Sequence, residues 1–248
     1  RPFCRRAYAA MVPKPEIRAM TAQEYDSCMD LAALTSSQAP AIKPLGIPTD
    51  AWRAFCAADT PKTAAVGSGL SLVAGAKGAP LGCLFLLPLV FEEPGEELYK
   101  LHRGLTVATE FSTAVWTDAL KWSRFNGLAV GSLAAGQALR CTLSGVSDEG
   151  KKAHVEVALC LRAVEVARTR GYGTLLVETS VAAQRNIWVE QCGGGVRAER
   201  QLSSFDSPSR ALGRYPCPAA EGSVSLCEVA VRRSYLDRRR RTEVALAD

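Results

Sequence analysis

Short hydrophobic runs alternate with amphipathic helical stretches along most of the chain, as in a mixed α/β (α+β) domain. Near the start, Glu16–Met20 (EIRAM) predicts a short strand. The pair Thr21-x-x-Glu24 directly after it predicts a capping box that opens a helix. The expected apolar face of this helix consists of Tyr25, Cys28, Met29 and Ala32.

A second helix and two strands are expected before residue 91. The helix begins at Thr49 or Asp50, and its predicted core side chains are Trp52, Phe55 and Cys56. Leu70–Ala74 and Leu81–Val90 are apolar runs that predict strands, joined by a turn at residues 75–78 (GAKG).

Between Glu92 and Phe125, apolar residues recur at helical spacing, so we expect mainly helix. An aromatic-rich stripe along this stretch favours a place in the core over a ligand wall. The stripe consists of Phe111, Val115, Ala119 and Trp122.

The second half of the chain continues the alternation of strands and helices. A long helix from about Lys151 to Arg170, with Gly171 as its C-cap, should bury Val155, Leu159, Ala163 and Val166 against a sheet. A second helix is expected at Ala182–Gln191, and a Ser/Pro-rich loop at Ser203–Gly222. The predicted strands are Ala138–Val146, Thr174–Glu178, Val196–Leu202 and Val224–Val231.

The chain shows no internal repeat and no low-complexity linker, so we expect one domain at residues 15–232. Residues 1–14 form a basic N-terminal extension, and residues 233–248 form an Arg-rich tail that includes the run Arg238–Arg241. A solvated tail is the simplest interpretation. Contact with an acidic protein, an anionic lipid or RNA is the alternative, although little aromatic interleaving favours RNA.

The opening RPFCRRAY fits the remnant of a cleaved organellar transit peptide, although trimming explains the missing Met equally well. The nine cysteines are odd in number, scattered and without a C-x-x-C pair, which favours a reducing compartment over a disulfide framework.

With only His102 and His154 available, we expect no metal site. The longest apolar run, Ala79–Phe91, is shorter than the roughly 20 residues that span a bilayer, so no membrane span is expected.

The order of elements, and above all the segment Val146–Tyr172 (VSDEGKKAHVEVALCLRAVEVARTRGY), resembles the GNAT N-acetyltransferase superfamily, in its arylalkylamine-type branch. Downstream, residues 174–194 (TLLVETSVAAQRNIWVEQCGG) keep the strand, turn, helix and terminal glycine of that family. The resemblance covers about residues 15 to 232. It implies the GNAT fold, a central mixed, twisted sheet of about seven strands with helices on both faces.

In that family an Arg/Gln-x-x-Gly-x-Gly/Ala loop after the fourth strand holds the pyrophosphate of acetyl-CoA through backbone N–H groups at a helix N-terminus. Carried over by position, the Arg/Gln falls on Lys151, the first Gly on His154 and the Gly/Ala on Glu156. The loop is therefore degenerate. The family-equivalent cofactor-binding residues are Val146, Lys151, Lys152, Ala153, His154, Val155 and Glu156.

The resemblance also implies a general base on the fourth strand and a general-acid Tyr four residues before the terminal glycine. The strand Ala138–Val146 contains no carboxylate; Asp148 and Glu149 follow it and are interpreted as solvated or capping acids. The Tyr position falls on Val189 or Glu190, depending on which glycine is the terminal one. No catalytic residue is therefore predicted.

These observations favour a GNAT-fold protein without acetyl-CoA as cofactor, which serves as a structural or binding subunit in a large organellar complex (plastid or mitochondrion). Its partners would be proteins, bound through the basic termini and exposed surface. The alternative is an active acyl-CoA-dependent N-acetyltransferase for a small amine or a protein amine, with acetyl-CoA between the strands that end near Val146 and Glu178. A nucleic-acid-binding module rests only on the arginine tail and is the least favoured.

Removal of residues 237–248 should leave the thermal unfolding transition nearly unchanged, because a run of like charges does not pack in a core. The same truncation should weaken association with a partner in a salt-dependent way. Calorimetry and pull-down at two salt concentrations measure both effects. Loss of the folded domain on truncation would contradict this prediction.

Overall fold

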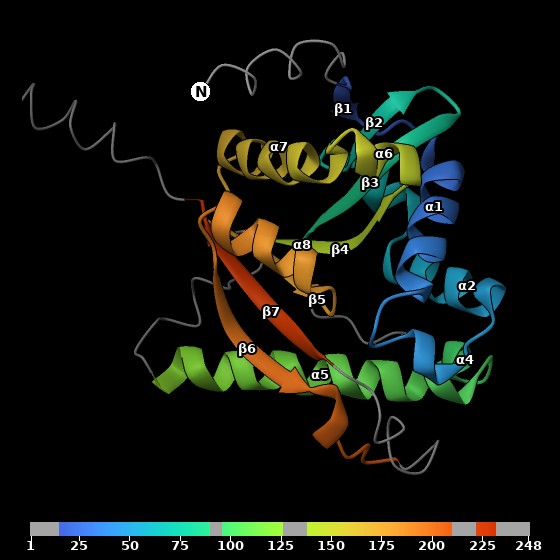
Figure 1. The fold of residues 1–248 in the computed structure, drawn as a ribbon, viewed down its shortest axis with the longest axis vertical. Helices are drawn as coiled ribbons and strands as arrows, with labels where there is room; N and C mark the ends of the chain where they lie inside the picture. The colour runs from blue at the N-terminus through green and yellow to red at the C-terminus, as the bar shows by residue number, and fades with distance from the viewer. Residues whose placement is uncertain (1–14, 90–95, 126–137, 210–221, 232–248) are drawn as a thin grey trace, which may run out of the picture.

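The computed structural model describes residues 15–89, 96–125, 138–209 and 222–231 (Figure 1). The N-terminal extension, the first residues of the helical stretch after Glu92 and the Arg-rich tail lie outside the described residues. The expectations for those segments therefore remain predictions.

A mixed seven-stranded sheet forms the centre of the protein, with strand order β1-β2-β3-β4-β5-β7-β6. Neighbouring strands are antiparallel except for β4 and β5, which are parallel. The sequence prediction of about seven strands is confirmed. The strands are β1 (Ile17–Ala19), β2 (Leu72–Ala76), β3 (Ala79–Pro88), β4 (Ala138–Val146), β5 (Thr174–Thr179), β6 (Gly195–Gln201) and β7 (Ser223–Ala230).

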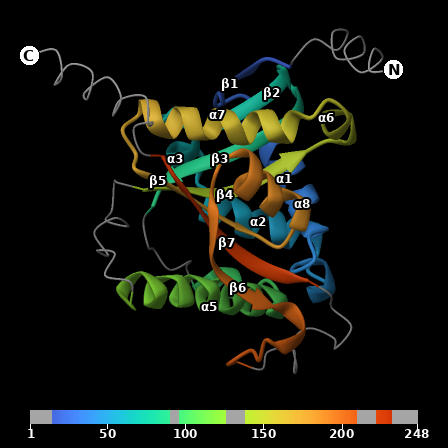
Figure 2. The same cartoon turned by 60° about the vertical axis from the view of Figure 1, so that its left-hand side comes forward.

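Helices cover both faces of this sheet, as expected (Figures 1 and 2). The α-helices are α1 (Tyr25–Ser37), α2 (Thr49–Asp59), α3 (Lys62–Gly67), α4 (Glu96–Tyr99), α5 (Arg103–Phe125), α6 (Asp148–Lys152), α7 (Val155–Thr169) and α8 (Ala182–Asn186). Two short 3-10 helices are η2 (Lys43–Leu45) and η5 (Leu202–Ser204), and η4 (Ile187–Gln191) is a π-helix that continues α8.

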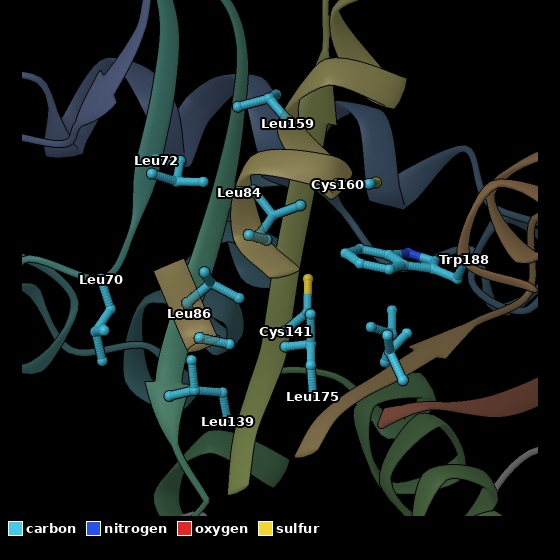
Figure 3. Close-up of a cluster of buried hydrophobic side chains, with 14 of the residues drawn as sticks. Leu70, Leu72, Leu84, Leu86, Leu139, Cys141, Leu159, Cys160, Leu175 and Trp188 are labelled. Atoms are coloured by element: carbon cyan, nitrogen blue, oxygen red, sulfur yellow. The ribbon is translucent and has the colours of Figure 1, made fainter. Parts of the chain in front are cut away.

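Helix α7 packs on one face of the sheet, and its buried side chains belong to the largest hydrophobic cluster of the described residues (Figure 3). Its buried stripe is Val155, Leu159, Cys160, Ala163 and Ala167. These side chains meet inward residues of every second position in the strands, among them Leu72, Leu84, Leu86, Leu139, Leu175 and Val177. Trp188 from η4 is fully buried in the same cluster.

The opposite face is divided between two groups of helices. Helices α1 to α3 cover β2 to β4 and bury Val73, Phe85 and Leu143, whereas α5 covers β5 to β7 through Phe111 and Val115. Gly145 allows α1 to lie directly on β4, because a Cβ there would come within 2.5 Å of the Ala32 Cα. The predicted stripe on α5 is confirmed for Phe111, Val115 and Ala119; the side chain of Trp122 is not among those described.

Several predicted elements need correction. The expected helix from Lys151 to Arg170 is two helices, because His154 adopts a left-handed conformation (φ 55°) between α6 and α7. The helix expected at Ala182–Gln191 changes from α to π at Ile187. Val166 is only partly buried, and Ala167 takes the buried position. Helix α3 and the short helix η2 were not predicted.

The capping box is only half formed. The Glu24 carboxylate accepts hydrogen bonds from the Thr21 N–H (3.2 Å) and hydroxyl (2.7 Å), but the helix begins one residue later, at Tyr25. Arg18 on β1 also pairs with Glu24 at 2.6 Å. The carboxylate therefore ties the first strand to the start of α1 rather than capping the helix alone.

Leu159→Asp should destabilise the fold by about 3 kcal/mol or more, because it places an unpaired charge at a side chain that is 1% exposed. This corresponds to a decrease in melting temperature of roughly 6 to 12 °C for a domain of this size. Leu161→Asp, two residues away on the same helix and 47% exposed, is the matched control and should change little. Equal melting temperatures for the two variants would contradict the placement of α7.

Candidate functional site

The two parallel strands at the centre of the sheet separate part-way along their length. Residues 138–141 of β4 pair with residues 174–177 of β5, and beyond Cys141 and Val177 the strands continue without pairing to one another. On its other side β4 carries a bulge, because Cys141 and Leu143 face consecutive residues of β3 and Thr142 is left over. The bulge turns Leu143 to the opposite face from Cys141.

A cavity of about 1020 Å³ fills the opening between these strands. It runs from the ends of β4 and β5 towards α1, α2 and α5, so all these elements contribute to its walls. The carboxylates that line it are Asp59, Glu110, Glu156 and Glu178, and the cationic residues are Arg140 and Lys151. Pockets of this size and mixed polarity are typical of small-molecule sites.

A chain of hydrogen bonds crosses the opening beyond the last paired residues of β4 and β5. Gln184 at the start of α8 donates from Nε2 to the Ser144 Oγ on β4 at 2.6 Å, and its Oε1 accepts from the Thr179 Oγ1 on β5 at 2.6 Å. The Thr179 hydroxyl also accepts the Val181 N–H at 3.1 Å. One glutamine therefore connects the two separated strands and the following helix.

The degenerate loop lies at the edge of the cavity, but only part of it faces the cavity. Of the seven residues predicted from the family pattern, Val146, Lys151 and Glu156 line it. Lys152 and His154 are exposed and Ala153 is half-buried. Val155, the first residue of α7, is buried in the core. Lys151 pairs with Asp148 at 2.8 Å, so part of its charge is neutralised within the loop.

His154 is the one residue other than glycine with positive φ in the described part of the chain. The family pattern has glycine at this position, and the backbone explains why, because a left-handed conformation costs a residue with a Cβ roughly 1–2 kcal/mol. A residue with a Cβ therefore occupies a backbone conformation that glycine adopts at lower cost. The side chain itself makes no capping hydrogen bond to α7.

Glu156 lies in the first turn of α7, where the backbone N–H groups of a helix have no intrahelical acceptor. Its side chain is partly buried against the cavity. Burial raises the pKa of this carboxyl group, and Lys151 offsets only part of the effect. A negatively charged group therefore occupies the end of the helix that would attract an anion.

The cavity wall also contains a carboxylate, Glu178, that was not predicted from the sequence as a site residue. Glu178, near the end of β5, accepts hydrogen bonds from the Ser112 hydroxyl (2.6 Å) and the Trp116 indole N–H (2.7 Å), both on α5. The signal in the sequence was a single acid after the apolar run TLLV, at the end of a strand expected to lie beside another parallel strand. Glu178 therefore places a carboxylate on the cavity wall from β5, whereas the family pattern implies a base on β4.

Arg140 on β4 is the cationic counterpart of Glu178. Its guanidinium lies over the Trp116 ring, 5.6 Å from the centroid, and its NH1 is 3.4 Å from Asp59 at the end of α2. Beside it, the hydroxyls of Thr60 and Thr142 bond at 2.9 Å. Trp116 therefore contacts both charged groups, the carboxylate at its N–H and the guanidinium at its ring face.

The remaining predicted positions lie away from this centre. Asp148 and Glu149 are exposed in α6, as expected, and Asp148 pairs with Lys151, which lowers the pKa of its carboxyl group. Val189 is half-buried against the core and Glu190 is exposed, both on the π-helix. Neither Val189 nor Glu190 carries the phenol that the family pattern places there.

The cysteines that the structure describes are unpaired, and all but Cys192 are buried. Burial raises the pKa of the Cys141 thiol, which lines the cavity, to about 12, so a thiolate nucleophile is not expected there.

Among residues 15–89, 96–125, 138–209 and 222–231, no group of three His, Cys, Asp or Glu residues is placed to hold a metal ion. No helix in the described ranges is both long and apolar enough to cross a membrane.

Neither a protein-family model nor a curated protein sequence matches the chain. Solved structures do. A putative arylalkylamine N-acetyltransferase 7 from the yellow fever mosquito superposes with a TM-score of 0.66 at 10% identity, covering 90% of this chain and 98% of that one. Arylalkylamine N-acetyltransferase 2 from Aedes aegypti gives 0.62 at 12% identity, with 89% and 100% coverage.

The chain has the GNAT fold. The C-terminal condensation domain of Ebony, solved with β-alanyl-dopamine, superposes on this chain with a TM-score of 0.63 at 13% identity, covering 88% of this chain and all of that one. At these identities the likeness concerns the fold, which agrees with the resemblance seen in the sequence.

Glu156→Gln should raise the melting temperature at neutral pH by roughly a few degrees. Burial disfavours the charged carboxylate in the folded state, so its folded pKa lies above the unfolded one. The penalty is absent below the unfolded pKa and grows as the pH rises through the folded pKa. The gain from the substitution should therefore vanish near about pH 4.

Glu149→Gln, at an exposed carboxylate of α6, is the control and should show no such gain. Melting curves across the pH range measure both variants. A gain for Glu156→Gln that is the same at acidic and neutral pH would mean that burial of the charge is not the cause.

Proposed function

We propose that this is a GNAT-fold protein that has lost acetyl-CoA binding and acetyl transfer, and that uses its cavity to bind a small molecule as a binding or structural subunit. The observation that carries the proposal is the presence of His154 and Glu156 at the start of α7, where the family pattern has Gly and Gly/Ala. The retained cavity supports ligand binding, and the altered loop argues against the usual cofactor.

Charge is the first obstacle to a diphosphate at this place. Two like charges about 5 Å apart repel by roughly 3 kcal/mol at an effective dielectric constant near about 20. This corresponds to about a hundredfold in affinity for each charge pair. Lys151 offsets part of the repulsion, but it already pairs with Asp148.

Bulk is the second obstacle. A glycine at position 154 lets the backbone approach the phosphates closely, whereas an imidazole occupies the space beside the same N–H groups. We therefore expect the side chains of His154 and Glu156 to obstruct the open, positively polarised surface that the cofactor needs at the helix N-terminus.

Active acyl-CoA-dependent N-acetyl transfer to a small amine or a protein amine is the second candidate. The observation that favours it is the cavity at the separation of β4 and β5, with the Glu178 carboxylate on its wall as a possible base. The arylalkylamine N-acetyltransferases that share the fold point in the same direction.

The setting of the protein stays part of the proposal. Basic residues in 1–14 and 233–248 would contact acidic protein partners. The basic composition of residues 1–8 favours an organelle, and the scattered cysteines favour a reducing compartment. The Ebony domain, which was solved with β-alanyl-dopamine, supports the idea that this fold holds a small molecule.

Titration calorimetry with acetyl-CoA tests the proposal. The unmodified chain should show no binding at millimolar ligand. The double variant His154→Gly with Glu156→Gly should recover binding, because it frees the N–H groups and removes the repulsion, by roughly a hundredfold or more. We expect no turnover in this variant, because the general-acid Tyr is still missing.

Glu149→Gly with Ala153→Gly is the matched control, since it adds two glycines to the same loop but keeps His154 and Glu156. This control should remain without binding. Micromolar binding of acetyl-CoA to the unmodified chain would overturn the proposal and favour the acetyltransferase.

A further inference from the structure

Arg140 carries a positive charge that the protein compensates only in part. Among the described residues its one ion pair is a single contact of 3.4 Å from NH1 to Asp59, and its Nε is buried without a hydrogen-bond partner. The rest of its support is the Trp116 ring, at 5.6 Å from the guanidinium carbon. Buried donors are usually satisfied, so this arrangement is incomplete.

The side chain of Arg140 is 26% exposed and lines the cavity. Because its Nε is buried, a ligand in the cavity would meet this side chain through the terminal N–H groups. The planar fork of terminal N–H groups suits a carboxylate, which binds such a fork through two parallel hydrogen bonds. The cation–π contact with the Trp116 ring stabilises the guanidinium at this place on the cavity wall.

A carboxylate, Glu178, contacts the same Trp116 indole. Glu178 accepts from the Trp116 N–H and from Ser112 through one oxygen, Oε2. No ion pair joins Glu178 to Arg140 in the described part of the chain, although both contact Trp116. The cavity therefore presents a separated cation and anion, with a further carboxylate, Asp59, beside the cation.

We infer that this cavity binds an amino acid, with the carboxylate of the ligand on Arg140 and its ammonium group on Glu178. The inference rests on the proposed function, because it names the ligand class of the same cavity. Aromatic side chains, among them Trp52 and Phe55, which stack with centroids 5.5 Å apart, line the same cavity. These rings favour an amino acid with an aromatic side chain.

Matched probes test the assignment of the carboxylate. Calorimetric titration of the full chain with L-tryptophan and with tryptamine compares two ligands that differ in the carboxylate alone, and L-phenylalanine with phenethylamine repeats the comparison. Each amino acid should bind at least roughly tenfold more tightly than its amine, the effect expected for one charged, bidentate contact.

Arg140→Met should abolish this preference, so that amino acid and amine bind equally. Arg140→Lys keeps a charge but loses the fork and should give an intermediate preference, and it also serves if the Met variant does not fold. Arg162→Met removes an exposed arginine on α7 that pairs with Glu165, and it should leave the preference unchanged.

Tighter binding of the amines to the unmodified chain would overturn the carboxylate assignment while leaving a ligand-binding cavity in place. A preference that survives in both Arg140 variants would overturn the role of Arg140. Absence of binding for all four probes at millimolar concentration would overturn the inference as a whole. The acetyl-CoA titration separately decides whether the cofactor site is lost, so the two failures are distinguishable.

Discussion

The separation of β4 from β5 is the constraint on which the rest of this protein depends. Parallel pairing ends at Cys141 and Val177. The bulge at Thr142 then reverses the side of the sheet on which the following β4 side chains lie. A sheet that opens in its middle must fill the gap with side chains or leave a cavity. Here Gln184 bridges one end of the gap, and the rest remains a cavity between helices on both faces.

The loop after β4 separates the requirements of folding from those of binding. The backbone makes a left-handed turn at position 154 just before the N-terminus of α7, although the histidine there makes the turn more costly than glycine would. The stabilisation from burying the α7 side chains Val155 and Leu159 against the sheet exceeds that cost, so the fold tolerates the strain. Anion binding has no comparable source of stabilisation, because it depends on the few backbone N–H groups that His154 and Glu156 flank.

Most of the architecture was predictable from the sequence, because strands with apolar runs and helices with apolar stripes bury enough surface to decide their own structure. The stripe Val155, Leu159 and Ala163 is one example. The break at His154 was not predictable from periodicity, since a helical pattern continues through it. Nor was the change to a π-helix at Ile187, which adds one residue to a turn without altering which residues are apolar.

The candidate site was less predictable than the fold. The loop residues followed from the family pattern, but Glu178, Arg140 and Asp59 lie on β5, β4 and α2 and come together only through the sheet order and the packing of α5 and α2. A single acid or arginine within an apolar strand signals a polar interior. The partner of such a residue is set by tertiary structure.

A crystal structure of the full chain grown with acetyl-CoA and L-tryptophan together tests the central claim most directly. The account predicts the amino acid in the cavity, with its carboxylate on Arg140, and no coenzyme along the start of α7. A diphosphate held by the N–H groups of Val155 and Glu156 would contradict it.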